Sequence, residues 1–437
     1  KRSMKRKVIA VAAAFLLIVS ILLYMTYQKN KPITLTFGMF AGSNWDVPNG
    51  ESYKIIDEVV ERFERKHPNV KVEYVSGLQK SDYSEWLSQQ ALKGNLPDVF
   101  MIRSNDLSTF SDIGIMQNLN SYIHKDDAFD KAAYFTPSYQ SGTYQKKQYA
   151  LPYESVPTLM YVNRTLLEKE GISLPSDDWT WADFYDICRR VTKDTNEDGA
   201  LDQFGVYGYG WQNAVASNGA TVFYAEGTKA TLSDERVYEA IEFTRRLEEL
   251  NQGMTPTSEM FDKGQVVFCP MRFSEYRTYK PYPWRVKKYS SFEWECIPMP
   301  AGPQGDNVSE LDTLLMGMAK TSQHKDLAWE FLKMLSYDET TQEDIFAYSQ
   351  GVSVLKDITN SKTVSRYLQE DTPGESAFKL DFFNKTMEHA IPVNKFSDYD
   401  QAMSVADSEI RRLLSTDEDI KTMVNTLQSK LDILLQN

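Results

Sequence analysis

Cysteine is scarce in this chain. Only three occur among 437 residues, Cys188, Cys269 and Cys296, which is too few for a disulfide framework. Their spacings match no zinc-binding pattern, because such sites need closely spaced pairs of cysteine or histidine. We therefore expect three buried thiols and no structural zinc.

Positive charge is also in short supply. The 48 lysine and arginine residues are outnumbered by 61 aspartate and glutamate residues, so the formal net charge is −13. The isoelectric point is near 5.0. A nucleic-acid-binding surface needs a positive footprint that neutralises phosphates. The charge balance therefore argues against nucleic acid as a partner.

Histidine is equally rare, and the common catalytic motifs are missing. The four histidines are scattered, and the chain has neither a G-x-S-x-G nucleophile motif nor a phosphate-binding G-x-x-x-x-G-K-[ST] loop. Glu293 and Glu295 form a close acidic pair on an expected strand. Glycosidase carboxylates, however, flank the scissile bond from two sides. We expect a protein that is not an enzyme.

The overall composition is that of an ordinary globular protein. Hydrophobic residues make up 42% of the chain, charged residues 25% and aromatic residues 13%, which excludes long disorder and fibrous structure. The length suits two domains. No flexible linker separates them, which indicates that the chain crosses between the domains more than once.

The first 31 residues combine a basic stretch with an apolar run. Five lysine and arginine residues precede the run, which extends from Val8 to Met25 with only Ser20 as an interruption. A helix of about 18 residues spans roughly 27 Å, close to the hydrocarbon thickness of a membrane. Neither a small-residue cleavage site nor a cysteine for lipid attachment follows. We expect residues 1–31 to be an uncleaved signal anchor with the rest of the chain outside the cell; a cleaved signal peptide is the alternative.

Strand and helix patterns alternate from residue 33 onward. Residues 33–39 alternate as a half-buried strand, residues 55–63 form one apolar helical stripe, and the sequence strand, helix, strand follows up to residue 102. This βαβαβ order predicts a mainly parallel sheet covered by helices. Later segments are expected to form strands at 266–268 and 294–299 and helices at 181–191, 233–250, 325–335, 340–349, 376–389, 399–414 and 418–435.

One loop carries the side chains of a calcium site. Oxygen-bearing side chains stand at alternate positions around Gly199, which permits a sharp turn. This is the spacing of the first three quarters of an EF-hand loop, although the glutamate that usually completes the shell is replaced by Gly205. We expect a structural Ca²⁺; a polar turn without metal is the alternative. The ligand set would be Asp194, Asn196, Asp198, Ala200 (through its carbonyl) and Asp202.

Aromatic residues in irregular segments are candidates for ligand contacts. Such rings suit sugars, because sugar C–H faces stack on aromatic surfaces while the hydroxyls need polar partners. A loop tryptophan can also be a structural anchor. The candidates are Trp45, Trp211, Tyr276, Tyr282 and Trp284.

Several stretches resemble the extracellular solute-binding proteins of ABC importers, in the sugar-binding group that includes maltose-binding protein. The resemblance is carried by segments 37–45, 63–72, 96–101, 149–163, 261–268 and 328–335. Together they span residues 32–437. The resemblance implies an α/β, two-lobed periplasmic-binding-protein-like fold (type II), with the lobes joined by several crossovers and the ligand held in a cleft between them. The implied first lobe is 32–153 plus 265–316, and the second is 154–264 plus 317–437.

The resemblance also implies a ligand site and a role. We expect a monomeric receptor at the outer face of the cell membrane that binds a sugar or oligosaccharide and delivers it to an ABC permease. A sensory binding protein that signals to a membrane sensor is the alternative. The implied ligand-binding residues are Ser43, Asn44, Trp45, Arg103, Asn105, Asp106, Glu154, Trp211, Asn213, Arg272 and Tyr276.

Overall fold

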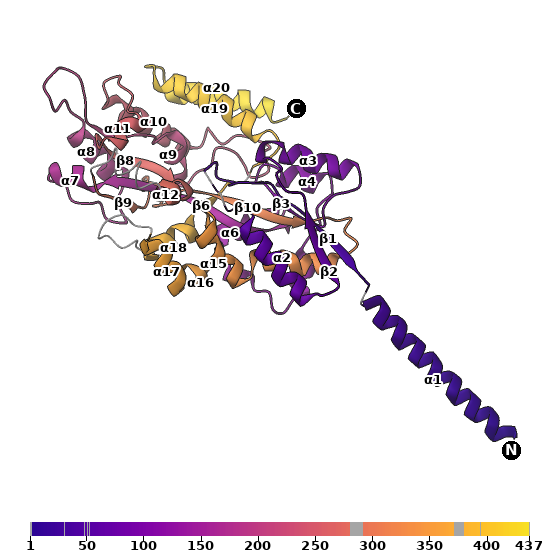
Figure 1. Ribbon diagram of the computed structural model, residues 1–437. Helices are drawn as coiled ribbons and strands as arrows, with labels where there is room; N and C mark the ends of the chain where they lie inside the picture. Colours follow the sequence, from indigo (N-terminus) through magenta and orange to yellow (C-terminus); the bar gives the residue numbers. More distant parts are fainter. Residues whose placement is uncertain are drawn as a thin grey trace.

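The computed structural model describes most of the chain. The described residues are 2–29, 31–47, 49, 51, 53–279, 292–370, 380–393 and 395–436. Tyr282 and Trp284, two candidate ligand residues, lie outside them. Two α/β lobes make up the main body, and an N-terminal helix extends away from it (Figure 1).

A mixed sheet runs through both lobes in the strand order β2-β1-β3-β10-β6-β8-β7. The predicted parallel pairing is confirmed for β1 with β2 and with β3, and β7 is also parallel to β8. The antiparallel strand β10, between β3 and β6, was not expected. The strands are β1 (Ile33–Gly38), β2 (Val70–Tyr74), β3 (Val99–Ile102), β6 (Ala150–Asn163), β7 (Phe204–Val206), β8 (Val266–Arg272), β9 (Trp294–Ile297), β10 (Glu310–Met318), β11 (Val352–Ser353) and β12 (Ile391–Pro392), with a separate hairpin of β4 (Thr143–Tyr144) and β5 (Lys147–Gln148).

Helices cover the sheet, and most of the longer ones begin and end within a few residues of the predicted positions, whereas the shorter ones were not predicted. Thr180 and Asp183 form a capping box at the start of α8, as expected of an N-cap threonine. The helix α10 is capped by Asp234, one residue after the predicted start. The longer helices are α2 (Lys54–Lys66), α3 (Lys80–Leu92), α8 (Trp181–Val191), α10 (Glu235–Glu249), α14 (Lys325–Ser336), α15 (Glu339–Tyr348), α18 (Leu380–His389), α19 (Tyr399–Leu414) and α20 (Ile420–Leu434). The shorter ones are α4 (Leu107–Asp112), α5 (Asn120–Lys125), α6 (Thr136–Gln140), α7 (Arg164–Lys169), α9 (Trp211–Ser217), α11 (Ser258–Asp262), α12 (Phe273–Tyr279), α16 (Lys356–Thr359) and α17 (Lys362–Glu370).

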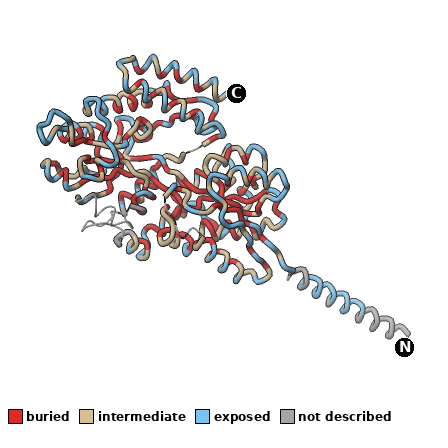
Figure 2. Tube along the Cα trace, turned by 45° about the horizontal axis from the view of Figure 1, so that its top comes forward, coloured by how far each residue is buried: buried red, intermediate tan, exposed pale blue. Residues whose placement is uncertain are grey.

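Strand β6 joins the two lobes. Its first half pairs with β10, and its second half pairs with β8 and β9. All but one of its residues are buried, so the link between the lobes lies inside the molecule (Figure 2). Two hydrophobic clusters lie along it. One contains β1, β3, β10 and α14, and the other contains α8, α9, α10, α19 and α20.

The lobe boundaries differ from those expected. Residues 265–316 were assigned to the first lobe, but β8 and β9 extend the sheet of the second lobe beyond β6. Residues 317–437 were assigned to the second lobe, but α14 packs on the first, where Phe331 makes edge contacts with Phe37 and Phe63 at centroid distances of 5.5 and 5.1 Å. Among the described helices of this range, α19 and α20 return to the second lobe, where they pack on α10. The physical reason is that an apolar stripe shows that a helix is packed, but not which surface it covers.

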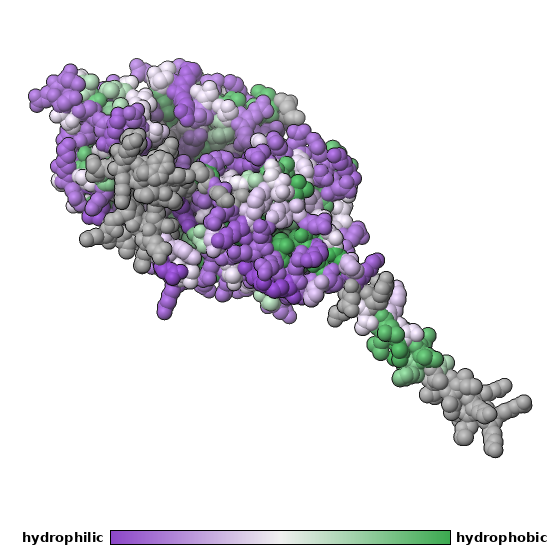
Figure 3. Space-filling view, in the orientation of Figure 1, coloured by the Kyte–Doolittle hydropathy of each residue, from purple (hydrophilic) through white to green (hydrophobic). Residues whose placement is uncertain are grey.

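The N-terminal helix α1 (Arg2–Lys29) stands apart from the lobes. Its described side chains, from residue 13 to residue 26, are exposed or nearly so, and their apolar surface forms the green band in Figure 3. Within the part of the chain that the structure describes, no helix is long and apolar enough to cross a membrane. The side chains of residues 1–12 and 27–30 lie outside that part, so the membrane anchor stays a prediction.

Candidate interlobe binding site

The loop after β1 meets the end of β8. Ser43 Oγ accepts a hydrogen bond from the Trp45 amide at 3.1 Å, and the Trp45 side chain is fully buried. The Arg272 guanidinium donates to the Trp45 carbonyl oxygen at 2.9 Å. Lys80 holds the same loop through the Asn44 carbonyl oxygen at 2.6 Å. The structure therefore brings the backbone of Trp45 into contact with Arg272, while the Trp45 ring is a core side chain.

Glu154 is a buried carboxylate in the middle of β6. It is only 4% exposed and accepts a hydrogen bond from Ser349 Oγ. Burial raises the pKa of Glu154, while the Ser349 hydroxyl, the Trp45 indole and the charge of Arg277 oppose this rise. Gly351 makes the packing possible, since a Cβ at this position would lie 2.3 Å from Glu154 Oε2.

A small cavity lies above Glu154. Its volume is about 30 Å³, enough for a water molecule but not for a sugar. The predicted residues Ser43, Asn44 and Glu154 line it, together with Met101 at the end of β3.

The loop after β3 and the helix α4 that follows it reach across to the second lobe. Asn105 Nδ2 donates to Asp400 Oδ2 on α19 at 2.8 Å, and Thr109 Oγ1 lies 2.6 Å from Ser397 Oγ. Asp106 accepts a hydrogen bond from Ser84 Oγ, and burial raises the pKa of its carboxyl, an effect that Ser84 and Arg103 oppose. The predicted group of Arg103, Asn105 and Asp106 therefore stands at the junction of the two lobes.

Sequence reasoning missed a second set of residues at this junction. Burial raises the pKa of Glu310 to about 7; the Asp312 carboxylate adds to the rise and Lys395 opposes it. The Glu310 side chain is nevertheless exposed to solvent at the start of β10, so the surrounding protein raises its pKa without excluding water. Burial and the nearby carboxylates of Glu310, Asp400 and Asp312 raise the pKa of Tyr399. The sequence gives one weak signal for Tyr399. It stands at the start of a predicted helix, directly after a loop that contains Pro392 and Lys395.

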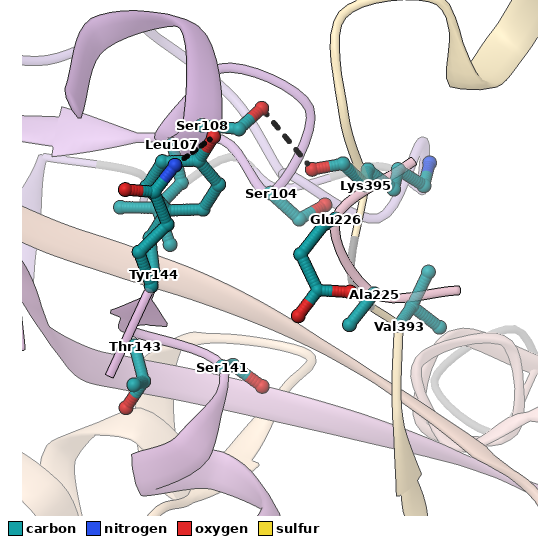
Figure 4. A pocket seen from close by; sticks show the side chains of 11 residues that line it. Ser104, Leu107, Ser108, Ser141, Thr143, Tyr144, Ala225, Glu226, Val393 and Lys395 are labelled. Atoms are coloured by element: carbon teal, nitrogen blue, oxygen red, sulfur yellow. Dashed lines mark hydrogen bonds between the residues drawn. The ribbon is translucent and has the colours of Figure 1, made fainter. Parts of the chain in front are cut away.

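A pocket between the lobes adjoins these residues (Figure 4). Its volume is about 50 Å³. Ser104 and Ser108 approach it from the first lobe, and Ser108 Oγ donates to the Lys395 carbonyl oxygen at 3.4 Å. Glu226 faces it from the second lobe. Polar groups from both lobes thus meet in one cleft.

The remaining predicted ligand residues are placed elsewhere. Trp211 was expected in a loop, but it begins α9, is 2% exposed, and donates from Nε1 to Asp407 Oδ1 at 2.9 Å. It lines a groove of about 770 Å³ formed by second-lobe residues alone. Asn213 Oδ1 accepts from the Gly210 amide at 3.0 Å and so caps α9. Tyr276 is buried and stacks on Phe273.

The predicted calcium loop is shaped by hydrogen bonds from its own amides. Asp194 accepts from the amides of Glu197 and Gly199 at 2.8 and 2.7 Å, and Asp198 Oδ1 accepts from the Ala200 amide at 2.9 Å. Asp194 Oδ1 also accepts from the Asn196 amide at 3.2 Å and so uses both of its lone pairs. Asp194 Oδ2 and Asp198 Oδ1 each keep a second lone pair that could bind a cation. Among the described residues, no group of three or more histidine, cysteine, aspartate or glutamate side chains is arranged to hold a metal ion.

Two α/β lobes joined by a buried strand, with a polar cleft between them, define the class of two-lobed binding proteins. The model of the family "Bacterial extracellular solute-binding protein" matches residues 48–342, and the chain belongs to this family.

Solved structures of sugar-binding proteins are similar throughout the chain. The cyclic α-maltosyl-1,6-maltose binding protein from Arthrobacter globiformis is 16% identical with a TM-score of 0.76, over 93% of this chain and 100% of that one. The sugar-binding protein MalE from Xanthomonas citri is 16% identical with a TM-score of 0.74, over 92% and 97%. The ABC substrate-binding protein Lmo0181 from Listeria monocytogenes, in complex with cycloalternan, is 19% identical with a TM-score of 0.67, over 93% and 100%. The expected fold is confirmed.

A relative in sequence is an uncharacterized lipoprotein in the oleD 5′ region of Streptomyces antibioticus. It is 24% identical over 329 residues, which cover 70% of this chain and 67% of the relative. The family and the similar structures are binding proteins rather than enzymes.

Proposed function

We propose that this chain is an extracellular receptor that binds a saccharide between its lobes and delivers it to the membrane subunits of an ABC importer. The observation that carries the proposal is the junction of the lobes, where Asn105 of the first lobe binds Asp400 of the second and carboxylates of both lobes lie near Tyr399. An aromatic ring among carboxylates and amides suits a sugar, because the ring stacks on C–H faces while the polar groups bind hydroxyls. The sugar-binding proteins of similar structure support this ligand class.

Within this proposal, the ligand lies against Tyr399 and the group of Arg103, Asn105 and Asp106. Ser43 and Asn44 supply polar groups after the end of β1, and Glu154 supplies one from the middle of β6. Trp45, Arg272 and Tyr276 hold that region in place. Small-molecule sites usually measure about 300–1,000 Å³, far more than the 50 Å³ present between the lobes. Ligand entry therefore requires the lobes to open by hinge bending.

The proposal includes the setting in which the receptor works. The N-terminal apolar helix holds the chain, as a monomer, at the outer face of the membrane, and the receptor binds its ligand without catalysing a reaction. A Ca²⁺ ion in the loop from Asp194 to Asp202 stabilises the second lobe without contacting the solute. The mass of the mature protein tests the anchor: a chain that starts after Tyr27 would contradict it.

A thermal-shift screen of the full chain in detergent tests the proposed function. A ligand that binds only the folded state raises the melting temperature by mass action. Neutral mono- and oligosaccharides are compared with amino acids and short peptides as control ligands. The proposal predicts stabilisation by at least one saccharide. Stabilisation by amino acids or peptides alone would contradict it.

A further inference from the structure

Carboxylates outnumber cations where the lobes meet. Asp106, Asp312 and Asp400 accept hydrogen bonds from residues 84, 104 and 105 at distances of 2.5, 3.3 and 2.8 Å. Asp400 is close enough to act on the charge of Asp106, and Asp312 and Asp400 both act on Tyr399. Glu310 lies close enough to Asp312 to feel its charge. Glu226 lines the pocket between the lobes together with Ser104 and Lys395, which contact Asp312 and Asp400. The basic groups among these residues are Arg103 and Lys395.

The ammonium group of Lys395 is already engaged by the protein. Lys395 Nζ lies 3.9 Å from Asp400 Oδ1 and stands over the ring of Tyr399, 5.3 Å from its centroid. Lys395 also lies close enough to Glu310 to act on its charge. A ligand carboxylate or phosphate would have to draw this ammonium away from the carboxylates that hold it. An ammonium group on the ligand would instead bind beside the Tyr399 ring and the carboxylates, which already bind the ammonium group of Lys395.

Like charges in a cleft repel strongly, because surrounding protein lowers the effective dielectric constant. A neutral saccharide adds no charge and can donate hydroxyl hydrogen bonds to the carboxylates, which are acceptors only.

We propose that the interlobe cleft selects saccharides by charge: it binds neutral and amine-bearing sugars and rejects acidic ones such as uronic acids and sugar phosphates. The inference rests on the proposed function and adds the charge class of its ligand. Repulsion of this kind is a common source of specificity, since a wrong partner is excluded by an unfavourable contact.

Sets of sugars matched in size and linkage test the selection. One set is glucose, glucosamine and glucuronic acid, a second is galactose, galactosamine and galacturonic acid, and the 1,4-linked dimers of each form further sets. Affinities are measured by calorimetry on the full chain in detergent. In any set that binds, the neutral or amine-bearing member should bind at least about tenfold tighter than the acidic member.

The two hypotheses fail in different ways. An acidic member that binds as tightly as its neutral counterpart would overturn the charge selection and leave the proposed function intact. If no saccharide of any class binds, the proposed function itself is wrong.

Variants that each remove one carboxylate test which residues produce the charge selection. Asp312→Asn and Asp400→Asn should each reduce the preference for the neutral over the acidic sugar several-fold, and the preference should also weaken as salt concentration rises. Glu73→Gln, which removes one carboxylate from the exposed face of β2, is the matched control and should leave it unchanged. If the preference for the neutral over the acidic sugar is the same in all variants, the assignment of the charge selection to Asp312 and Asp400 is wrong. The melting temperature of each variant shows that it is folded.

Discussion

At the scale of single residues, environment decides whether a tryptophan binds ligand or supports the fold. The sequence places Trp45 and Trp211 in Gly- and Asn-rich segments, which favoured a ligand role for both. In the structure both are buried, at 0% and 2% exposure, and Trp211 is bound to Asp407 of another helix. Composition around a residue could not reveal a partner that lies 196 positions away in the chain.

Trp211→Ala should therefore act on stability. Removing a buried tryptophan leaves a cavity and costs about 3–5 kcal/mol of folding free energy. Trp86→Ala, which removes a half-buried tryptophan from α3, is the matched control and should cost less. Chemical denaturation of both variants measures the free energy of unfolding that each one loses. A small loss for Trp211→Ala together with lost saccharide affinity would show instead that Trp211 is a ligand residue.

Glu310 gives the molecule a pH dependence with a defined sign. Its pKa is raised to about 7 in the folded state, above the usual glutamate value of about 4.3. The folded protein thus binds an extra proton between these pH values, and the contribution of Glu310 to stability falls as pH rises through this window. Glu310→Gln should flatten the fall in melting temperature between about pH 5 and 8, whereas Glu73→Gln should not. If the melting temperature depends on pH in the same way for both variants and the unmodified protein, the pKa of Glu310 is not raised.

At the scale of elements, local sequence signals were sufficient to predict where most long helices and several strands lie in the chain. They did not predict which surface each element packs on. Proline, capping residues and apolar stripes predicted α2, α8, α14 and α19 to within a few residues, because these signals act within one or two turns. The strand β10 was missed because Asp312 and Thr313 interrupt its apolar pattern. The lobe membership of α14 was wrong because its partners Phe37 and Phe63 lie far away in the sequence.

The loop from Asp194 to Asp202 offers a test at the same scale. If it binds Ca²⁺, a chelator should lower the melting temperature of the unmodified protein, and Asp198→Ala should remove this response because it deletes a ligand position. Glu197→Ala removes the same charge from a position between the ligands and should keep the response. A melting curve that chelator leaves unchanged would identify the loop as a polar turn without metal.

At the scale of the whole molecule, the fold could be predicted further than the site. The order of strands and helices, together with the resemblance to solute-binding proteins, indicated two lobes and a cleft. The predicted group of Arg103, Asn105 and Asp106 reached that cleft because carboxyl ends of parallel strands meet at one edge of a sheet. Tyr399, Glu310 and Lys395 join them only through the crossovers between lobes, which no local pattern encodes.

Calorimetric titration of Tyr399→Ala with a saccharide that stabilises the unmodified protein tests the central claim most directly. The account predicts one saccharide per chain and a loss of about ten- to a hundredfold in affinity, or roughly 1–3 kcal/mol, without loss of fold. Tyr238→Ala, which removes a half-buried tyrosine from α10, should bind as the unmodified protein does. Unchanged affinity in a folded Tyr399→Ala variant would contradict binding in the interlobe cleft.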